Sequence, residues 1–185
     1  MGGLALTAVT VYCGSRRGVP ESYLALASEV GAEIARRGWS LVWGGGRTSM
    51  MGAVAEAARK GGARTVGVIP HALVDREWAD EDADDLLRVE TMRDRKALME
   101  AHGDAFLALP GGIGTAEELF EVWTARVLAM HTKPVVLLDV DGHYAGLLAW
   151  LAELRERGFV SQFALDSLVV ADDVQAALDA CQSNV

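Results

Sequence analysis

Three glycines within four positions form the first candidate site in this 185-residue sequence. They lie in Pro110-Gly111-Gly112-Ile113-Gly114-Thr115, between a predicted strand, Ala105–Leu109, and a long predicted helix, Thr115–Met130. Glycine lets the backbone approach a ligand closely, and the free amides at a helix start favour an anion. Thr115 can cap the helix or donate its hydroxyl to a phosphate oxygen. A structural turn explains one or two glycines but not three, so the segment predicts a phosphate-binding loop.

A second glycine run, Gly44-Gly45-Gly46, also follows a predicted strand and precedes a predicted helix. Read as G-x-G-x-x-G, it places Ser49 where the dinucleotide fingerprint has its third glycine. The next strand ends in Ile69-Pro70-His71, without the acidic residue that the fingerprint also requires. The sequence contains no Gly-Lys-Ser/Thr of a Walker loop. These differences argue against NAD binding and against ATP hydrolysis, and they favour a monophosphate ligand.

Arg95 is the first charged candidate. On the predicted helix Arg93–Ala101 it lies three residues from Met92 and from Leu98, and four from Met99. A charged side chain within an apolar stripe either extends to solvent or faces a pocket, and the spacing leaves both readings open.

Glu118 is the second charged candidate, one turn beyond the glycine loop. It shares a helix face with Val122 and Ala125, whereas Glu117 aligns with Glu121. We therefore expect Glu118 to be the partly desolvated carboxylate, within reach of a ligand's sugar. Together with an arginine opposite, it would form an active-site constellation, although helical spacing does not show that the two helices meet.

Strands and helices that alternate strictly must position these loops. Continuously apolar runs are typical of strands covered on both faces, and the alternation with helices predicts a parallel sheet. We predict an α/β, three-layer Rossmann-like fold with about six or seven strands, as one nucleotide-monophosphate-binding domain over residues 1–185. The predicted strands are Ala8–Cys13, Leu41–Trp43, Thr65–Ile69, Arg88–Glu90, Ala105–Leu109, Val135–Leu138 and Leu168–Val170. The predicted helices are Glu21–Arg37, Met50–Lys60, Arg93–Ala101, Thr115–Met130, Tyr144–Arg157 and Asp172–Cys181.

Composition excludes several classes of partner. The net charge of −9 argues against nucleic acid, whose binders carry a basic face. No apolar run approaches the ~20 residues of a membrane span, so we predict a cytoplasmic protein with no membrane partner. The acidic run between Glu77 and Asp85 predicts a solvated loop. We expect no metal, because the cysteines lack ligand spacing and the four histidines are scattered surface or loop residues.

The motifs together resemble the Lonely guy family, the cytokinin riboside 5′-monophosphate phosphoribohydrolases, long mislabelled as lysine decarboxylases. The segment from Pro110 to Glu118 fits the family's P-G-G-x-G-T-x-x-E, and the segment from Met92 to Met99 is similar to its M-x-x-R-K-x-x-M. Further segments fall in family order: Cys13-Gly14-Ser15, Gly44-Gly45-Gly46 with Met50-Met51-Gly52, and Gly67-Val68-Ile69-Pro70. Two departures are Ser49, where the family commonly has Gly, and Arg93-Asp94, where it often has His-Glu.

The resemblance implies cleavage of AMP or N6-prenyl-AMP to free base and ribose 5-phosphate, without a metal or nicotinamide cofactor, by a homodimer. It implies that Arg95 and Glu118 are the catalytic pair, with Arg95 orienting Glu118. The expected substrate- and phosphate-binding residues are Ser15, Gly44, Gly45, Glu77, Met92, Lys96, Gly111, Gly112, Ile113, Gly114, Thr115, Glu117 and Thr124. An alternative is a non-catalytic nucleotide or molybdenum-cofactor carrier on the same fold, which would bind without turnover and would not need the Arg95–Glu118 pair.

Overall fold

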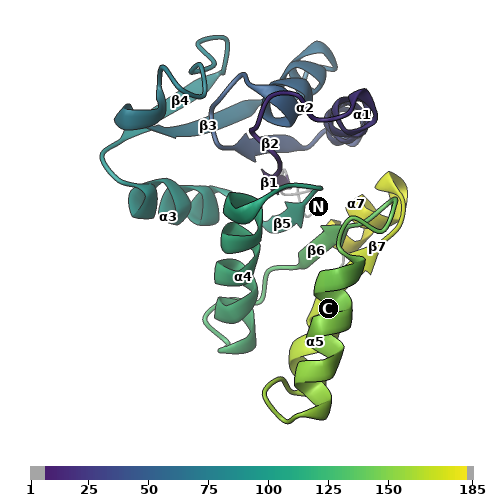
Figure 1. Cartoon of the computed structure of the whole chain (residues 1–185). Helices are drawn as coiled ribbons and strands as arrows, with labels where there is room; N and C mark the ends of the chain where they lie inside the picture. Colours follow the sequence, from purple (N-terminus) through teal and green to yellow (C-terminus); the bar gives the residue numbers. More distant parts are fainter. Residues whose placement is uncertain (1–6, 183–185) are drawn as a thin grey trace, which may run out of the picture.

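The computed structural model describes residues 7–182, in which a seven-stranded parallel sheet is flanked by helices (Figure 1). Its strands are β1 (Ala8–Tyr12), β2 (Ser40–Trp43), β3 (Thr65–Pro70), β4 (Asp85–Val89), β5 (Ala105–Ala108), β6 (Val135–Leu138) and β7 (Leu168–Ala171). The helices are α1 (Glu21–Arg36), α2 (Ser49–Lys60), the short 3₁₀ helix η1 (His71–Leu73), α3 (Met92–His102), α4 (Ile113–Val127), α5 (Ala145–Glu156), α6 (Gln162–Asp166) and α7 (Val174–Gln182). The predicted α/β, Rossmann-like architecture is confirmed.

Both faces of the sheet are covered, which explains why the strands are continuously apolar. Helices α1, α2 and α7 pack on one face, where Val9 and Val11 of β1 join their core. Helices α3, α4 and α5 pack on the other face, against Tyr12 of β1 and Phe106 of β5. Successive side chains of a strand point to opposite faces, so each central strand contributes to both cores.

The strand order β4-β3-β2-β1-β5-β6-β7 places a topological switch between β1 and β5. The chain builds outward from β1 to β4, returns through α3, and continues on the other side of β1 (Figure 1). Ligands of such sheets bind beyond the carboxyl ends of the strands at the switch. The loops after β1 and β5 meet there, because the Gly14 amide donates to the Pro110 carbonyl at 3.1 Å.

The structure differs from the predicted elements around the acidic run. Strand β4 begins at Asp85, three residues earlier than predicted, and the solvated-loop interpretation is wrong for the buried Asp80, whereas Asp84 is exposed. Asp80 is only 1% exposed, and Asp84 accepts hydrogen bonds from the Thr65 amide (2.7 Å) and hydroxyl (2.9 Å). Partners distant in sequence therefore hold charges that composition assigned to solvent.

Helix α4 is also shifted relative to its prediction. It begins at Ile113, within the glycine loop, and ends at Val127, just before Ala129 takes a positive φ of 57°. The short elements η1 and α6 were not predicted. Among residues 7–182, no helix combines the length and the apolar character that crossing a membrane requires.

Candidate active site

A pocket of about 550 Å³ opens at the switch between β1 and β5. The loops after β1, β2 and β5, together with α3 and the start of α4, provide most of its walls. The predicted site residues that line it are Ser15, Gly44, Glu77, Met92, Arg95, Gly111, Gly112, Ile113, Gly114, Thr115 and Glu118. Residues from five separate segments thus meet in one cavity.

The loop from Pro110 to Thr115 leads into an uncapped helix start. Gly112 is the N-cap of α4 and no side chain caps it, so the first amides of the helix remain open to a ligand. Thr115 is buried inside the first turn and does not cap the helix. A Cβ on Gly111 would lie 2.1 Å from the Thr115 hydroxyl oxygen, whereas one on Gly114 would meet nothing within 4 Å. Internal packing therefore requires glycine at position 111, and the loop suits an anion.

Arg95 faces the pocket and does not extend to solvent; it is 3% exposed. Its Nε donates to the Val68 carbonyl (3.1 Å), and its Nη2 donates to the Gly44 carbonyl (2.6 Å) and to Glu77 Oε2 (2.7 Å). A Cβ on Gly44 would approach Arg95 Nη2 to 2.2 Å. The second glycine run therefore makes room for a guanidinium, which is a role that the sequence did not reveal.

Glu118 is half-buried on the wall of the same pocket, as its helix face predicted. Burial raises the pKa of its carboxyl from 4.5 to about 7, although the positive charge of Arg95 acts in the opposite direction. Among residues 7–182, Glu118 has no hydrogen-bond or ion-pair partner. The ion pair of Arg95 is with Glu77, so the structure does not show the expected orientation of Glu118 by Arg95. Glu118 is instead free to act on a ligand.

Four predicted site residues lie outside the pocket lining: Gly45, Lys96, Glu117 and Thr124. The Lys96 ammonium pairs with Glu117 and, at 2.7 Å, with Glu121, and these bonds raise the pKa of the lysine. Thr124 is exposed on α4, about 13 Å along the helix axis from Thr115. Within this chain, the structure does not bring these side chains to the glycine loop.

The pocket residues that the sequence analysis did not predict include Arg16, Tyr23 and His143. The His143 Nε2 lies 2.9 Å from the Gly111 carbonyl oxygen, and the Tyr23 hydroxyl donates to Asp141 at 2.7 Å. The available signal was positional, because His143 follows β6 at the same edge of the sheet as the glycine loops. A scattered histidine is uninformative until the strand order is known.

The Arg93-Asp94 departure has a local explanation at Asp94. The Asp94 carboxylate accepts from the Thr91 amide at 3.1 Å, while the Thr91 hydroxyl oxygen accepts from the Asp94 amide at 3.1 Å. This capping box fixes the start of α3 at Met92, three residues before Arg95. Asp94 thus positions the helix that carries the arginine.

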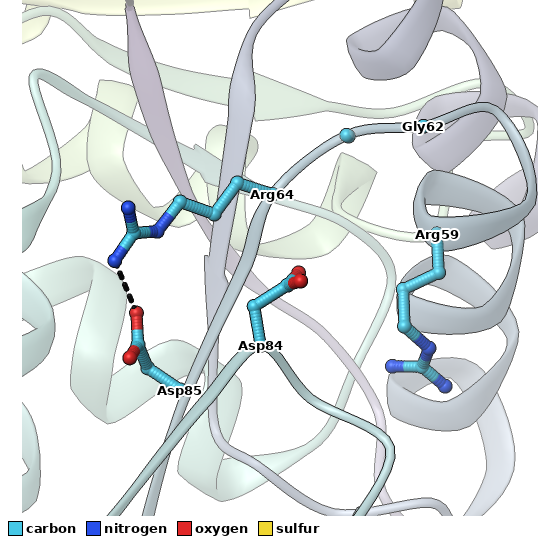
Figure 2. A pocket seen from close by; sticks show the side chains of 6 residues that line it. Arg59, Gly62, Arg64, Asp84 and Asp85 are labelled. Carbon is cyan, nitrogen blue, oxygen red and sulfur yellow. Dashed lines mark hydrogen bonds and ion pairs between the residues drawn. The ribbon is translucent and has the colours of Figure 1, made fainter.

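A second hollow, of about 620 Å³, lies at the opposite edge of the sheet (Figure 2). Figure 2 shows Arg64 reaching Asp85, with which it forms an ion pair of 2.6 Å. Asp84 accepts a hydrogen bond from the Thr65 hydroxyl. Arg59 is paired with Asp80 at 2.8 Å. The charged side chains of this hollow are paired or hydrogen-bonded within the protein, and among residues 7–182 no group of three or more His, Cys, Asp or Glu side chains could hold a metal ion.

Comparisons with known proteins identify the family of the chain. A family model described as "possible lysine decarboxylase" matches residues 51–181. The cytokinin riboside 5′-monophosphate phosphoribohydrolase of Mycobacterium marinum is 55% identical over 94% of this chain and 92% of its own length. The protein of that name from Mycobacterium tuberculosis is 56% identical over the same shares. One from Arabidopsis thaliana is 44% identical over 88% of this chain and 76% of its own length.

Solved structures share the fold at much lower identity. The molybdenum cofactor binding protein of Rippkaea orientalis superposes with a TM-score of 0.73 at 20% identity, over 96% of both chains. The molybdenum cofactor carrier protein of Chlamydomonas reinhardtii gives a TM-score of 0.72 at 23% identity, over 95% of this chain and 96% of its own. These likenesses concern architecture alone. The sequence matches, over nearly the whole chain, place it in the "possible lysine decarboxylase" family, among the cytokinin riboside 5′-monophosphate phosphoribohydrolases.

Proposed function

We propose that the chain is a single nucleotide-binding domain that hydrolyses the N-glycosidic bond of a nucleoside 5′-monophosphate, releasing free base and ribose 5-phosphate. The observation that carries this proposal is Glu118, a half-buried and unpaired carboxylate one turn beyond an uncapped glycine helix start. The names of the mycobacterial and plant relatives support the same reaction.

The glycine loop would hold the phosphate, since amides 112–115 form a helix start without a side-chain cap. Ser15 lies on the facing loop and would donate to a phosphate or ribose oxygen. Fixing the phosphate supplies remote binding energy that positions the sugar. The ribose C1′ would then lie beside Glu118, the next pocket residue along α4.

Cleavage of the glycosidic bond passes through an oxocarbenium-like state. The Glu118 carboxylate would stabilise the positive charge at C1′ and accept a proton from the attacking water. The C1′–N bond breaks with its electron pair on the base nitrogen, the water oxygen bonds to C1′, and the proton accepted by Glu118 passes to the base nitrogen, which gives the neutral base and restores the carboxylate. Arg95, held by Glu77 in the same pocket, would stabilise the departing base through its ring nitrogens.

The base of the substrate would lie against an apolar wall of the pocket. We propose that the substrate is AMP or an N6-prenylated AMP. Methionines dominate this wall: Met50, Met51, Met92 and Met99 line the pocket, together with Leu73. Methionine adapts its shape to apolar ligands, so the wall suits a purine with an added hydrocarbon group.

Glu118→Gln tests the reaction, with Glu117→Gln as its neighbouring control. Purified proteins are incubated with AMP and with isopentenyl-AMP, and the released bases are separated by chromatography. Loss of a positioned base costs about 10²- to 10⁴-fold in rate, so Glu118→Gln should bind AMP in calorimetry yet release almost no adenine, while Glu117→Gln stays active. Binding by the wild-type protein without turnover would instead favour the carrier alternative.

We also propose a homodimer and a cytoplasmic location. Large apolar side chains are exposed at both ends of α4, with Ile113 at 92%, Leu128 at 65% and Met130 at 75% exposure. A second copy that covered this helix would bury them. Sedimentation equilibrium tests the dimer, with a monomer mass as the contrary result. Fractionation of cells producing a tagged chain tests the location.

A further inference from the structure

Asp80 is a buried carboxylate that the reaction above does not use. It lies in the segment between η1 and β4 and is 1% exposed. Its Oδ2 lies 2.8 Å from Arg59 Nη1, and its Oδ1 lies 3.7 Å from Arg47 Nε. An aspartate is almost never buried so completely without opposite charge, and here α2 and the preceding loop supply that charge.

The segment that contains Asp80 is hydrogen-bonded to the second glycine run. The Asp80 amide donates to the Gly45 carbonyl at 2.8 Å. In the other direction, the Arg47 amide donates to the carbonyls of Glu77 (3.0 Å) and Trp78 (2.8 Å). Residues 77–80 therefore lie beside the second glycine run, whose Gly44 carbonyl accepts a hydrogen bond from Arg95.

Local preference does not explain the shape of this segment. Trp78 has a φ of +49°, a backbone conformation that residues other than glycine rarely adopt. A Cβ on Gly46 would lie 2.9 Å from the Glu77 carbonyl oxygen, which shows how closely the two backbones approach. Such a conformation persists only where surrounding contacts hold it.

We propose that Asp80 is a positioning residue: its ion pairs with Arg59 and Arg47 hold residues 77–80 against the second glycine run. Through this segment, Asp80 keeps the Glu77 carboxylate 2.7 Å from Arg95 Nη2. The inference rests on the proposed function for the role of Arg95 at the substrate. Without Asp80, the segment leaves the glycine run and the guanidinium loses its carboxylate partner.

A double-mutant cycle separates positioning from plain stability. Asp80→Asn and Glu77→Gln should each lower kcat/KM for AMP by on the order of 10- to 100-fold. The double variant should be no slower than the slower single variant, because both changes remove the same contact. Asp84→Asn is the control from the same acidic run; it is bonded to Thr65 at the far edge of the sheet and should keep wild-type kcat/KM. Fully additive losses would overturn the proposal.

Proteolysis tests the segment without relying on turnover. Arg76 is exposed beside the segment, so trypsin cleavage after Arg76 reports its release from the glycine run. Asp80→Asn should be cut there at least several-fold faster than the wild type, and Asp84→Asn at the wild-type rate, with fragments identified by mass. Equal rates for Asp80→Asn and wild type overturn the inference.

A third variant covers the case in which Asp80→Asn does not fold. Arg59→Gln breaks the same ion pair at a residue outside the pocket, and it should reproduce the faster cleavage after Arg76. Unchanged cleavage in folded Arg59→Gln overturns the inference. A wild-type protein that releases no adenine from AMP contradicts the proposed function alone, since the cleavage comparison still tests the segment.

Discussion

Replacing Glu118 by glutamine should stabilise the fold at alkaline pH while it removes turnover. Burial raises the pKa of this carboxyl from 4.5 to about 7 in the native protein. Between these two pH values the native state keeps a proton that the unfolded chain releases, so the stability of the wild type falls as pH rises through this window. Below pH 4.5 both states are protonated and the effect disappears.

The size of the effect follows from the same values. One pH unit corresponds to 1.36 kcal/mol, so ionised Glu118 destabilises the native protein by up to about 3 kcal/mol above pH 7. Residual solvent contact of the half-buried side chain reduces this to about 2 kcal/mol. For a chain of this length, a gain of that size raises Tm by about 4–8 °C.

Urea unfolding of wild type and Glu118→Gln at several pH values between 5 and 8.5 measures the difference directly. The advantage of Glu118→Gln should grow steadily as pH rises to about 7.5 and then level off. Glu117→Gln is the matched control: its exposed carboxylate is paired with Lys96, so the substitution should give no such gain. A Glu118→Gln advantage that is constant with pH, or a loss of stability at pH 8, would refute the reasoning.

Three further substitutions, two of them with a control variant, test the loops around the pocket. Ser49→Gly should raise the free energy of unfolding by about 1 kcal/mol, because Ser49 has a φ of 53° that glycine adopts without strain; a lower urea midpoint would contradict this. Gly111→Ala should lower it by about 1–3 kcal/mol through the 2.1 Å contact of its Cβ, while Gly114→Ala unfolds at the wild-type urea concentration. Arg16 lines the pocket and would donate to the phosphate, so Arg16→Gln should raise KM for AMP about tenfold, the equivalent of one charge-assisted hydrogen bond. Arg17→Gln, which removes a cation stacked 3.7 Å over Trp78, should leave KM near its wild-type value, and equal changes in both variants would exclude the role of Arg16.

The order of elements could be predicted from the sequence because strands covered on both faces are continuously apolar. Ala105–Leu109 and Val135–Leu138 were identified in this way, and both are strands that are buried throughout. Strand order could not be predicted, because it depends on where the chain crosses over after β4. The placement of β5 beside β1, which brings the two loops together, became visible only in the fold.

The candidate site was predictable where one helix carried the pattern. Glu118 and Glu117 were separated correctly by helix face, since one lines the pocket and the other binds Lys96. Helical spacing could not decide whether Arg95 extends to solvent or faces a pocket, because its partner, Glu77, lies in a loop without periodicity. Asp80 was misread for a similar reason: its charge is neutralised by an arginine on α2, 21 positions earlier.

The charges of the pocket distinguish hydrolysis from simple binding. The architecture alone does not distinguish the two functions, because a protein named as a molybdenum cofactor binding protein has the same architecture, with a TM-score of 0.73. Two carboxylates, Glu77 and Glu118, line a pocket whose glycine loop suits an anion. A pure binder of an anionic ligand gains nothing from a carboxylate that also destabilises its own fold. A catalyst does gain, because ionised Glu118 would stabilise the positive charge that appears at C1′ only in the transition state.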